Sequence, residues 1–243
     1  MQAFGGPVLI EKPAAEEAYT SAAAAAHDMD RVRELLTALN DGGRGLLRIY
    51  RPHPTAAFAP RDTTLPQYGE AAKAMELRGY APVERRAGGQ LAVYDAGALV
   101  IDLVAPHAEP RQHVIERFRG FSAAIASALN RFSIDARVGE VAGEYCPGDY
   151  SVNAEGRIKL VGVAQRVGRR AYHLGAVISV QPSEAAKRAV AEAYRIYGFP
   201  FAPDTFGALH DLDPGLGFAE LREALAVELG RLLPIEAELN PCG

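Results

Sequence analysis

The chain has no tryptophan and only two cysteines among its 243 residues. Cys146 and Cys242 stand far apart, which excludes the dense disulfide framework of small secreted domains. No CxxC pair and no histidine–cysteine pair at zinc spacing occurs. We therefore predict no metal site, and a reducing cytoplasmic location is the simplest interpretation.

Long apolar runs are also missing. No run reaches the ~20 residues that a membrane-spanning helix needs. The N-terminus lacks the basic segment of a signal peptide, and Glu11 and Lys12 interrupt its short apolar stretch. The net charge is −4, which argues against a broad basic surface for nucleic acid. We expect neither a membrane nor a nucleic acid as partner.

Hairpins alternate with helices in the predicted element order. Apolar periodicity predicts helices over 14–40, 66–78, 111–130, 182–198 and 217–232. Strands are predicted over 46–50, in three segments of 81–106, over 134–138 and in three segments of 150–180. Residues 51–66 are predicted to be a proline-rich loop. The motifs GxGxxG and GxxxxGK[ST] are absent. This order favours an α+β fold, with a mixed or antiparallel β-sheet flanked by helices, over a doubly wound sheet.

The segment "ERRAGGQLAVYDAG", residues 84–97, places two arginines before a Gly-Gly turn. Adjacent glycines allow backbone N–H groups to approach an anion or a narrow ligand closely. Arg85 and Arg86 would add charge-assisted hydrogen bonds. The alternative is a plain hairpin with solvated arginines.

The segment "GEYCPGDYSVNAEGRIKLVGVAQRV", residues 143–167, holds a thiol in a turn and a lysine in an apolar strand. Pro147 and Gly148 favour a turn that presents Cys146. A reactive thiol needs a lowered pKa, which nearby cations or a helix N-terminus can provide. Lys159 could supply the cation, because strand alternation points it away from Ile158 and Leu160. The alternative is a buried, inert cysteine and an unrelated surface lysine.

Two histidines deserve testing as partners of the thiol. A Cys–His hydrolase would need His53 or His173 beside Cys146. Histidines with an ordinary structural role are the alternative for both.

Three blocks in order resemble the lipoate and biotin protein ligase superfamily. They are "RIYRPHPTAAFAPRDT", "RRAGGQLAVYDAG" and "KLVGVAQRV", and with the strand ending in "GAVISV" they span about residues 46–180. The resemblance implies a catalytic domain of the class II biotin and lipoate ligase type over 1–180. Residues 181–243 would be a C-terminal helical extension packed on the same domain.

The "YCPGDYSV" stretch is most similar to the cysteine-dependent octanoyl- and lipoyl-amidotransferases of that superfamily. The resemblance implies that Cys146 is the nucleophile and that Lys159 holds the acyl carbonyl. The sequence departs from the ligase pattern at Ala87, Gln90 and Tyr94, which replace a serine, a glycine and a histidine. The changes at Gln90 and Tyr94 fit an adenylating ligase poorly and the transferase subgroup better, whereas the missing serine at Ala87 removes a polar contact and motivates a non-catalytic alternative.

The expected activity is transfer of an octanoyl or lipoyl group to a lysine of a carrier protein through a Cys146 thioester. One alternative is an ATP-dependent lipoate–protein ligase, which would need ATP and magnesium; another is a non-catalytic protein that binds acyl groups or a lipoyl domain. The transferase needs no cofactor, and its partners are an acyl donor and a lipoyl-domain or glycine-cleavage H-type carrier. The substrate-binding residues expected beside Cys146 and Lys159 are Arg51, Arg85, Arg86, Gly88, Gly89, Asp95, Gly162 and Gln165.

Overall fold

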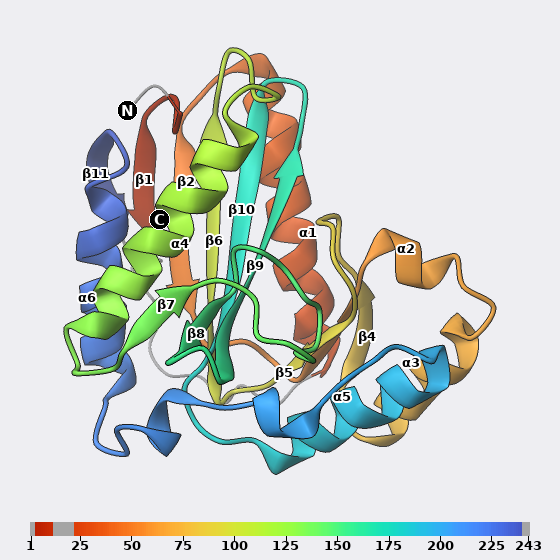
Figure 1. Ribbon diagram of the computed structural model, residues 1–243. Coiled ribbons are helices and arrows are strands. Elements are labelled where there is room, and N and C mark those ends of the chain that lie inside the picture. Colours follow the sequence, from red (N-terminus) through yellow and green to blue (C-terminus); the bar gives the residue numbers. More distant parts are fainter. Residues whose placement is uncertain (1–2, 12–21, 240–243) are drawn as a thin grey trace.

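A mixed eight-stranded sheet forms the centre of the computed structural model, which describes residues 3–11 and 22–239 (Figure 1). Its strand order is β11-β1-β2-β6-β10-β9-β8-β7. β1 runs parallel to both neighbours, while the other pairs are antiparallel. The strand bounds are β1 Val8–Glu11, β2 Gly45–Tyr50, β6 Ala98–Pro106, β7 Ala136–Val138, β8 Val152–Ala154, β9 Ile158–Val167, β10 Ala171–Ser179 and β11 Ile235–Leu239.

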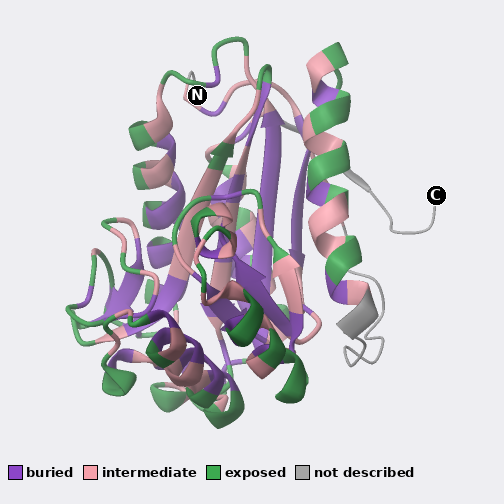
Figure 2. Ribbon diagram, turned by 90° about the vertical axis from the view of Figure 1, so that its right-hand side faces the viewer, coloured by how far each residue is buried: buried purple, intermediate pink, exposed green. Residues whose placement is uncertain are grey.

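Helices cover both faces of this sheet (Figure 1). Helices α4 (Val114–Asn130) and α6 (Phe218–Gly230) lie on one face, where Phe121, Ile125 and Leu225 are fully buried. Helix α1 (Ala22–Ala38) lies on the other face and buries Val32 against β6 and β10. The strands of the sheet are mostly buried, and the outer helix faces are exposed (Figure 2). None of the described helices has the length and hydropathy to cross a membrane.

A second, three-stranded sheet has the order β4-β3-β5. It consists of β3 (Thr55–Phe58), β4 (Ala81–Glu84) and β5 (Ala92–Tyr94), and it packs with α3 (Tyr68–Leu77) and α5 (Glu184–Tyr197) around its own core. The prediction of a loop over 51–66 is wrong here. The four residues of β3 are buried and pair with strands on both sides, and a short helix α2 (Pro60–Thr63) follows.

The predicted fold class is confirmed. The predicted strands and long helices are present with shifted ends. Strands β1 and β11, like β3, were not predicted. The predicted helix 14–40 is described from residue 22 onward and continues into a 3-10 turn, Leu39–Asp41; further 3-10 turns are Pro203–Thr205 and Leu209–Asp211. Residues 12–21 and Cys242 lie outside the described residues.

The segment after residue 180 contacts both cores. Helix α5 packs on the small sheet, whereas α6 packs beside α4 on the large one. The chain then adds β11 to the edge of the large sheet, next to β1. The boundary at residue 180 stays a prediction.

Candidate active site

A buried carboxylate organises the loop that presents the thiol. Glu144 accepts hydrogen bonds from the backbone N–H of Val141 at 3.0 Å and of Gly148 at 3.2 Å, and from the hydroxyl of Ser151 at 2.6 Å. Its side chain is completely buried. A buried charge of this kind needs a partner of opposite charge, since its desolvation is expensive. Lys159 supplies that partner.

Lys159 comes from β9 and is 1% exposed. Its Nζ donates to Glu144 Oε1 at 2.9 Å and to the carbonyls of Tyr145 and Cys146, both at 2.8 Å. An ammonium group has three donors, and these three contacts use all of them. Lys159 thus lies next to the cysteine loop, as predicted. In this arrangement, however, its three hydrogen bonds stabilise the loop and leave no donor for a substrate.

The sulfur of Cys146 lies against the arginine–glycine loop. The backbone N–H of Gln90 donates to Sγ at 3.2 Å, and Arg85 Nη2 lies 3.6 Å from it. Gly89 has a φ of +101°, and a Cβ built on it would lie only 2.8 Å from Sγ. The pair of donors stabilises negative charge on the sulfur. The glycine is needed because any side chain would displace the thiol.

The backbone of Cys146 is strained. Its φ is +44°, a conformation that non-glycine residues rarely adopt. The N–H of Cys146 donates to the hydroxyl of Tyr194 on α5 at 2.6 Å, and that hydroxyl donates in turn to the carbonyl of Leu91 at 3.1 Å. Helix α5 therefore links the turn at Cys146 to Leu91, which follows the Gly88–Gly89 turn.

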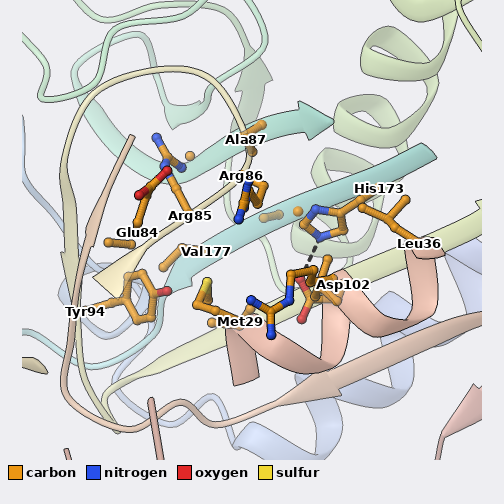
Figure 3. A pocket seen from close by; sticks show the side chains of 18 residues that line it. Met29, Leu36, Glu84, Arg85, Arg86, Ala87, Tyr94, Asp102, His173 and Val177 are labelled. Carbon is orange, nitrogen blue, oxygen red and sulfur yellow. Dashed lines mark hydrogen bonds and ion pairs between the residues drawn. The ribbon is translucent and has the colours of Figure 1, made fainter. Parts of the chain in front are cut away.

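An apolar slot lies beside Arg85, the arginine that contacts this thiol, and Figure 3 shows the side chains that line the slot. Arg85, which contacts Sγ, lines one end, and His173 and Leu36 line the other. Its floor is made of small residues of β9 and β10, and its roof is the apolar side of α1. The slot encloses about 690 Å³ of empty space, a value that includes the open solvent at its mouth. The floor residues are Gly162, Ala164, Gly175 and Ala176, and the roof residues are Met29, Val32 and Leu36.

A β-bulge puts the lysine and the slot on the same side of β9. The pairing of β9 with β8 changes register next to Asn153, which pairs with Lys159. A bulge inserts one residue and thereby shifts the alternation of side chains. Lys159 consequently faces the same side as Gly162, whose built Cβ would lie 3.6 Å from the lysine Cε.

Buried charges line the far end of the slot. His173 Nε2 donates to Asp102 Oδ1 at 2.7 Å, and Arg48 Nη2 lies 2.7 Å from Asp102 Oδ2. Burial alone would raise the pKa of Asp102, but Arg48 and His173 outweigh it and lower that pKa to about 2. Arg48 also contacts Asp28 of α1 at 3.2 Å. His173 therefore pairs with Asp102 rather than with Cys146, and the arrangement that a Cys–His hydrolase needs is not formed by this histidine.

Three of the predicted binding residues, Arg51, Asp95 and Gln165, do not line the slot. Arg51 donates to the carbonyl of Ala96 at 2.9 Å and stacks on Phe218. Asp95 accepts from the N–H of Gly97 at 2.9 Å and from the hydroxyl of Ser183 at 2.7 Å, which ties the β5–β6 turn to the start of α5.

Gln165 faces α4 on the opposite side of the sheet. Its Oε1 accepts two hydrogen bonds from the fully buried Arg117, at 3.0 and 3.1 Å. Of the predicted residues, the structure brings together Cys146, Lys159, Arg85, Arg86, Gly88, Gly89 and Gly162.

The family model described as "Lipoyl protein ligase A/B catalytic domain" matches residues 25–227. The chain belongs to this family. The predicted resemblance is confirmed at that level.

Two relatives of this lipoyl ligase family member carry the same name. An octanoyl-[GcvH]:protein N-octanoyltransferase of Geobacillus kaustophilus is 29% identical over 196 residues, which cover 80% of this chain and 68% of that protein. The protein of that name from Exiguobacterium sibiricum is 31% identical over 144 residues, 58% of this chain and 51% of the relative.

Solved structures show the same fold. Lipoate–protein ligase A bound with ATP superposes with a TM-score of 0.67 at 20% identity, covering 97% of this chain and 89% of that one. A bipartite lipoate protein ligase of Thermoplasma acidophilum gives 0.64 at 17%, covering 97% and 86%.

Sequence reasoning missed Glu144, Tyr194 and the Arg48–Asp102 pair. Glu144 could have been found, because a lone lysine in an apolar strand needs a buried carboxylate and Glu144 stands two residues before the thiol. Tyr194 could not, since only the packing of α5 brings it near. No cluster of three or more metal-ligating side chains occurs among the residues that the structure describes.

Proposed function

We propose that the protein transfers an octanoyl group from one carrier-protein lysine to another through a thioester on Cys146. The observation that carries the proposal is the partly buried Cys146 sulfur, held by an arginine and a backbone N–H next to an apolar slot. The name of the relatives supports the substrate, octanoyl-GcvH, and a second lipoyl carrier as acceptor. The same name supports transfer over the ATP-dependent ligase and the non-catalytic alternatives.

The chemistry has two steps. The thiolate attacks the carbonyl of the octanoyl amide, a C–S bond forms, the C–N bond breaks and the leaving lysine amine takes up a proton. The acceptor amine then attacks the thioester, the C–N bond forms, the thiolate leaves and the new amide loses a proton. Since an amide is broken and an amide is made, no nucleotide is needed to drive the exchange. The proposal therefore includes no ATP, no metal and no other cofactor.

Individual residues have separate parts in the proposal. Arg85 and the Gln90 N–H stabilise the thiolate, and the exposed Gly88–Gly89 backbone next to Sγ offers donors for the oxyanion. We propose Lys159 as a positioning residue, because binding the acyl carbonyl would require it to give up a contact with Glu144, Tyr145 or Cys146. The scarcity of cysteines supports a reducing, cytoplasmic location.

The test is incubation with octanoyl-GcvH, with and without ATP, followed by peptide mass spectrometry. We expect an octanoyl thioester on Cys146, formed without ATP. Cys146→Ser should form no thioester. Octanoylation of a carrier that needs ATP and proceeds equally well in Cys146→Ser would establish the ligase alternative instead.

A further inference from the structure

Hydrogen bonds hold every polar atom of Cys146. Its sulfur lies 3.2 Å from the backbone nitrogen of Gln90 and 3.6 Å from Arg85 Nη2. Its carbonyl accepts from Lys159 Nζ at 2.8 Å. Its N–H donates to the hydroxyl of Tyr194 at 2.6 Å, which is the shortest of these contacts. The turn that presents the thiol is therefore fixed from several sides, and Tyr194 is the partner that comes from helix α5.

The Tyr194 hydroxyl connects this turn to the segment that holds the sulfur. Besides accepting from Cys146, the hydroxyl lies 3.1 Å from the carbonyl of Leu91 and 3.3 Å from the side-chain oxygen of Gln90. Gln90 is also the residue whose N–H contacts Sγ, and its carbonyl accepts from Arg85 Nη2 at 2.7 Å. The backbone and the sulfur of Cys146 are thus tied to the same two residues, Gln90 and Leu91.

The tyrosine is suited to hold a strained backbone. Tyr194 is 1% exposed, and burial raises its pKa well above the ordinary value, so the hydroxyl keeps its proton and can both accept and donate. Cys146 has a φ of +44°, a conformation that persists in a non-glycine residue only where the surroundings enforce it. An N–H left without an acceptor in a partly buried turn is unfavourable. Loss of the hydroxyl should therefore let the turn relax and move the sulfur away from its donors.

We infer that Tyr194 is a positioning residue for the nucleophile. Its hydroxyl holds the Cys146 turn in the left-handed conformation that places Sγ against the Gln90 N–H and Arg85. The inference rests on the proposed function, because it takes Cys146 to be the residue that is acylated. It also means that the predicted C-terminal extension, residues 181–243, contributes to the active site.

Tyr197 provides the matched control, because it lies about one turn further along the same helix. Its side chain is also buried, and its hydroxyl donates to a backbone carbonyl as well, that of Asp62, at 3.3 Å. Tyr194→Phe and Tyr197→Phe each remove one buried hydroxyl and keep the ring. A purely structural role of the hydroxyl predicts similar effects of the two variants on stability and on the reaction. A positioning role predicts that only the reaction separates them.

The experiment follows two reactions of the full chain. The first is single-turnover acylation of Cys146 over a range of octanoyl-GcvH concentrations, which separates the rate constant from the affinity for the donor. The second is alkylation of Cys146 by iodoacetamide, followed by peptide mass spectrometry so that Cys242 is measured separately. Urea titrations of each variant give the folded fraction.

The two variants should differ in rate and not in donor affinity. In Tyr194→Phe the acylation rate constant should fall ~10- to 100-fold, because a displacement of ~1 Å at a reacting group has an effect of this size. Alkylation of Cys146 should slow about fivefold to tenfold, which corresponds to one lost hydrogen bond. Donor affinity should stay within about twofold, and Tyr197→Phe should keep both rates within about twofold, since its hydroxyl bonds Asp62.

The inference is overturned if the two variants lose acylation rate equally, if Tyr194→Phe acylates at the original rate, or if its loss only matches its unfolded fraction. The alkylation readout does not depend on the proposed function. If alkylation separates the two variants but octanoyl-GcvH never acylates Cys146, the proposed function fails and the positioning role of Tyr194 stands.

Discussion

Replacing Gly89 by alanine tests the surroundings of the thiol most sharply. The glycine φ is +101°, and the added Cβ would lie 2.8 Å from Cys146 Sγ and 2.8 Å from Arg85 Nη2. Contacts this short do not occur in folded proteins, so the loop or the sulfur must move. The backbone strain alone amounts to ~1–3 kcal/mol. A displacement of ~1 Å at a reacting group can reduce the rate ~100-fold.

The neighbouring glycine provides the control. A Cβ built on Gly88 meets nothing within 4 Å, and that residue has no positive φ. We expect Gly89→Ala to slow octanoyl transfer ~100-fold and to slow alkylation of Cys146 by iodoacetamide, because the Gln90 N–H loses its place beside the sulfur. Gly88→Ala should keep both rates close to those of the original protein. Equal transfer and alkylation rates in the two variants would refute this account of the site.

Three further predictions concern buried groups. Lys159→Met should lower the free energy of unfolding by ~3–5 kcal/mol in urea titrations, because Glu144 keeps a buried, unpaired charge; unchanged stability would return the lysine to the role of acyl ligand. The pKa of Asp102 is lowered from 3.8 to about 2. The ionised carboxylate therefore contributes ~2 kcal/mol to stability above about pH 4, and this contribution is lost as the pH falls toward 2. Asp102→Asn should flatten that part of the plot of unfolding free energy against pH, and identical plots for the two proteins would contradict the pairing. Gln165→Leu should destabilise the fold, because it removes the side chain that accepts two hydrogen bonds from the buried Arg117. The KM for octanoyl-GcvH should stay unchanged, and a raised KM with normal stability would place Gln165 at the substrate after all.

Local sequence patterns were sufficient for most of the fold. Alternation and turn residues predicted the hairpins over 81–106 and 150–180, because those signals act within a few residues. β3 was missed because proline on both sides of Thr55–Phe58 suggested a loop, whereas β4 and β5 provide partners on its two edges. Pairing across a sheet is a non-local property that no window of sequence contains.

The site residues also divide into those that local motifs identify and those whose role depends on the fold. Cys146 and Gly89 were identified by motif, and the structure adds why they belong together: the glycine leaves room for the sulfur. Lys159 lies beside the carbonyl of Cys146, as its motif suggested. Its buried partner Glu144 was missed, although a lysine in an apolar strand calls for a carboxylate nearby. Gln165 belonged to a motif block and yet faces Arg117, since the bulge in β9 changes which side each residue of the strand takes.

The most direct test of the central claim is a chase of the isolated acyl-enzyme. Protein acylated by octanoyl-GcvH is purified, mixed with an unmodified acceptor lipoyl domain in the absence of donor and ATP, and followed by intact mass. We predict that the octanoyl group leaves Cys146 at the same rate at which it appears on the acceptor lysine. A stable adduct, while the complete mixture still octanoylates the acceptor, would contradict the thioester route.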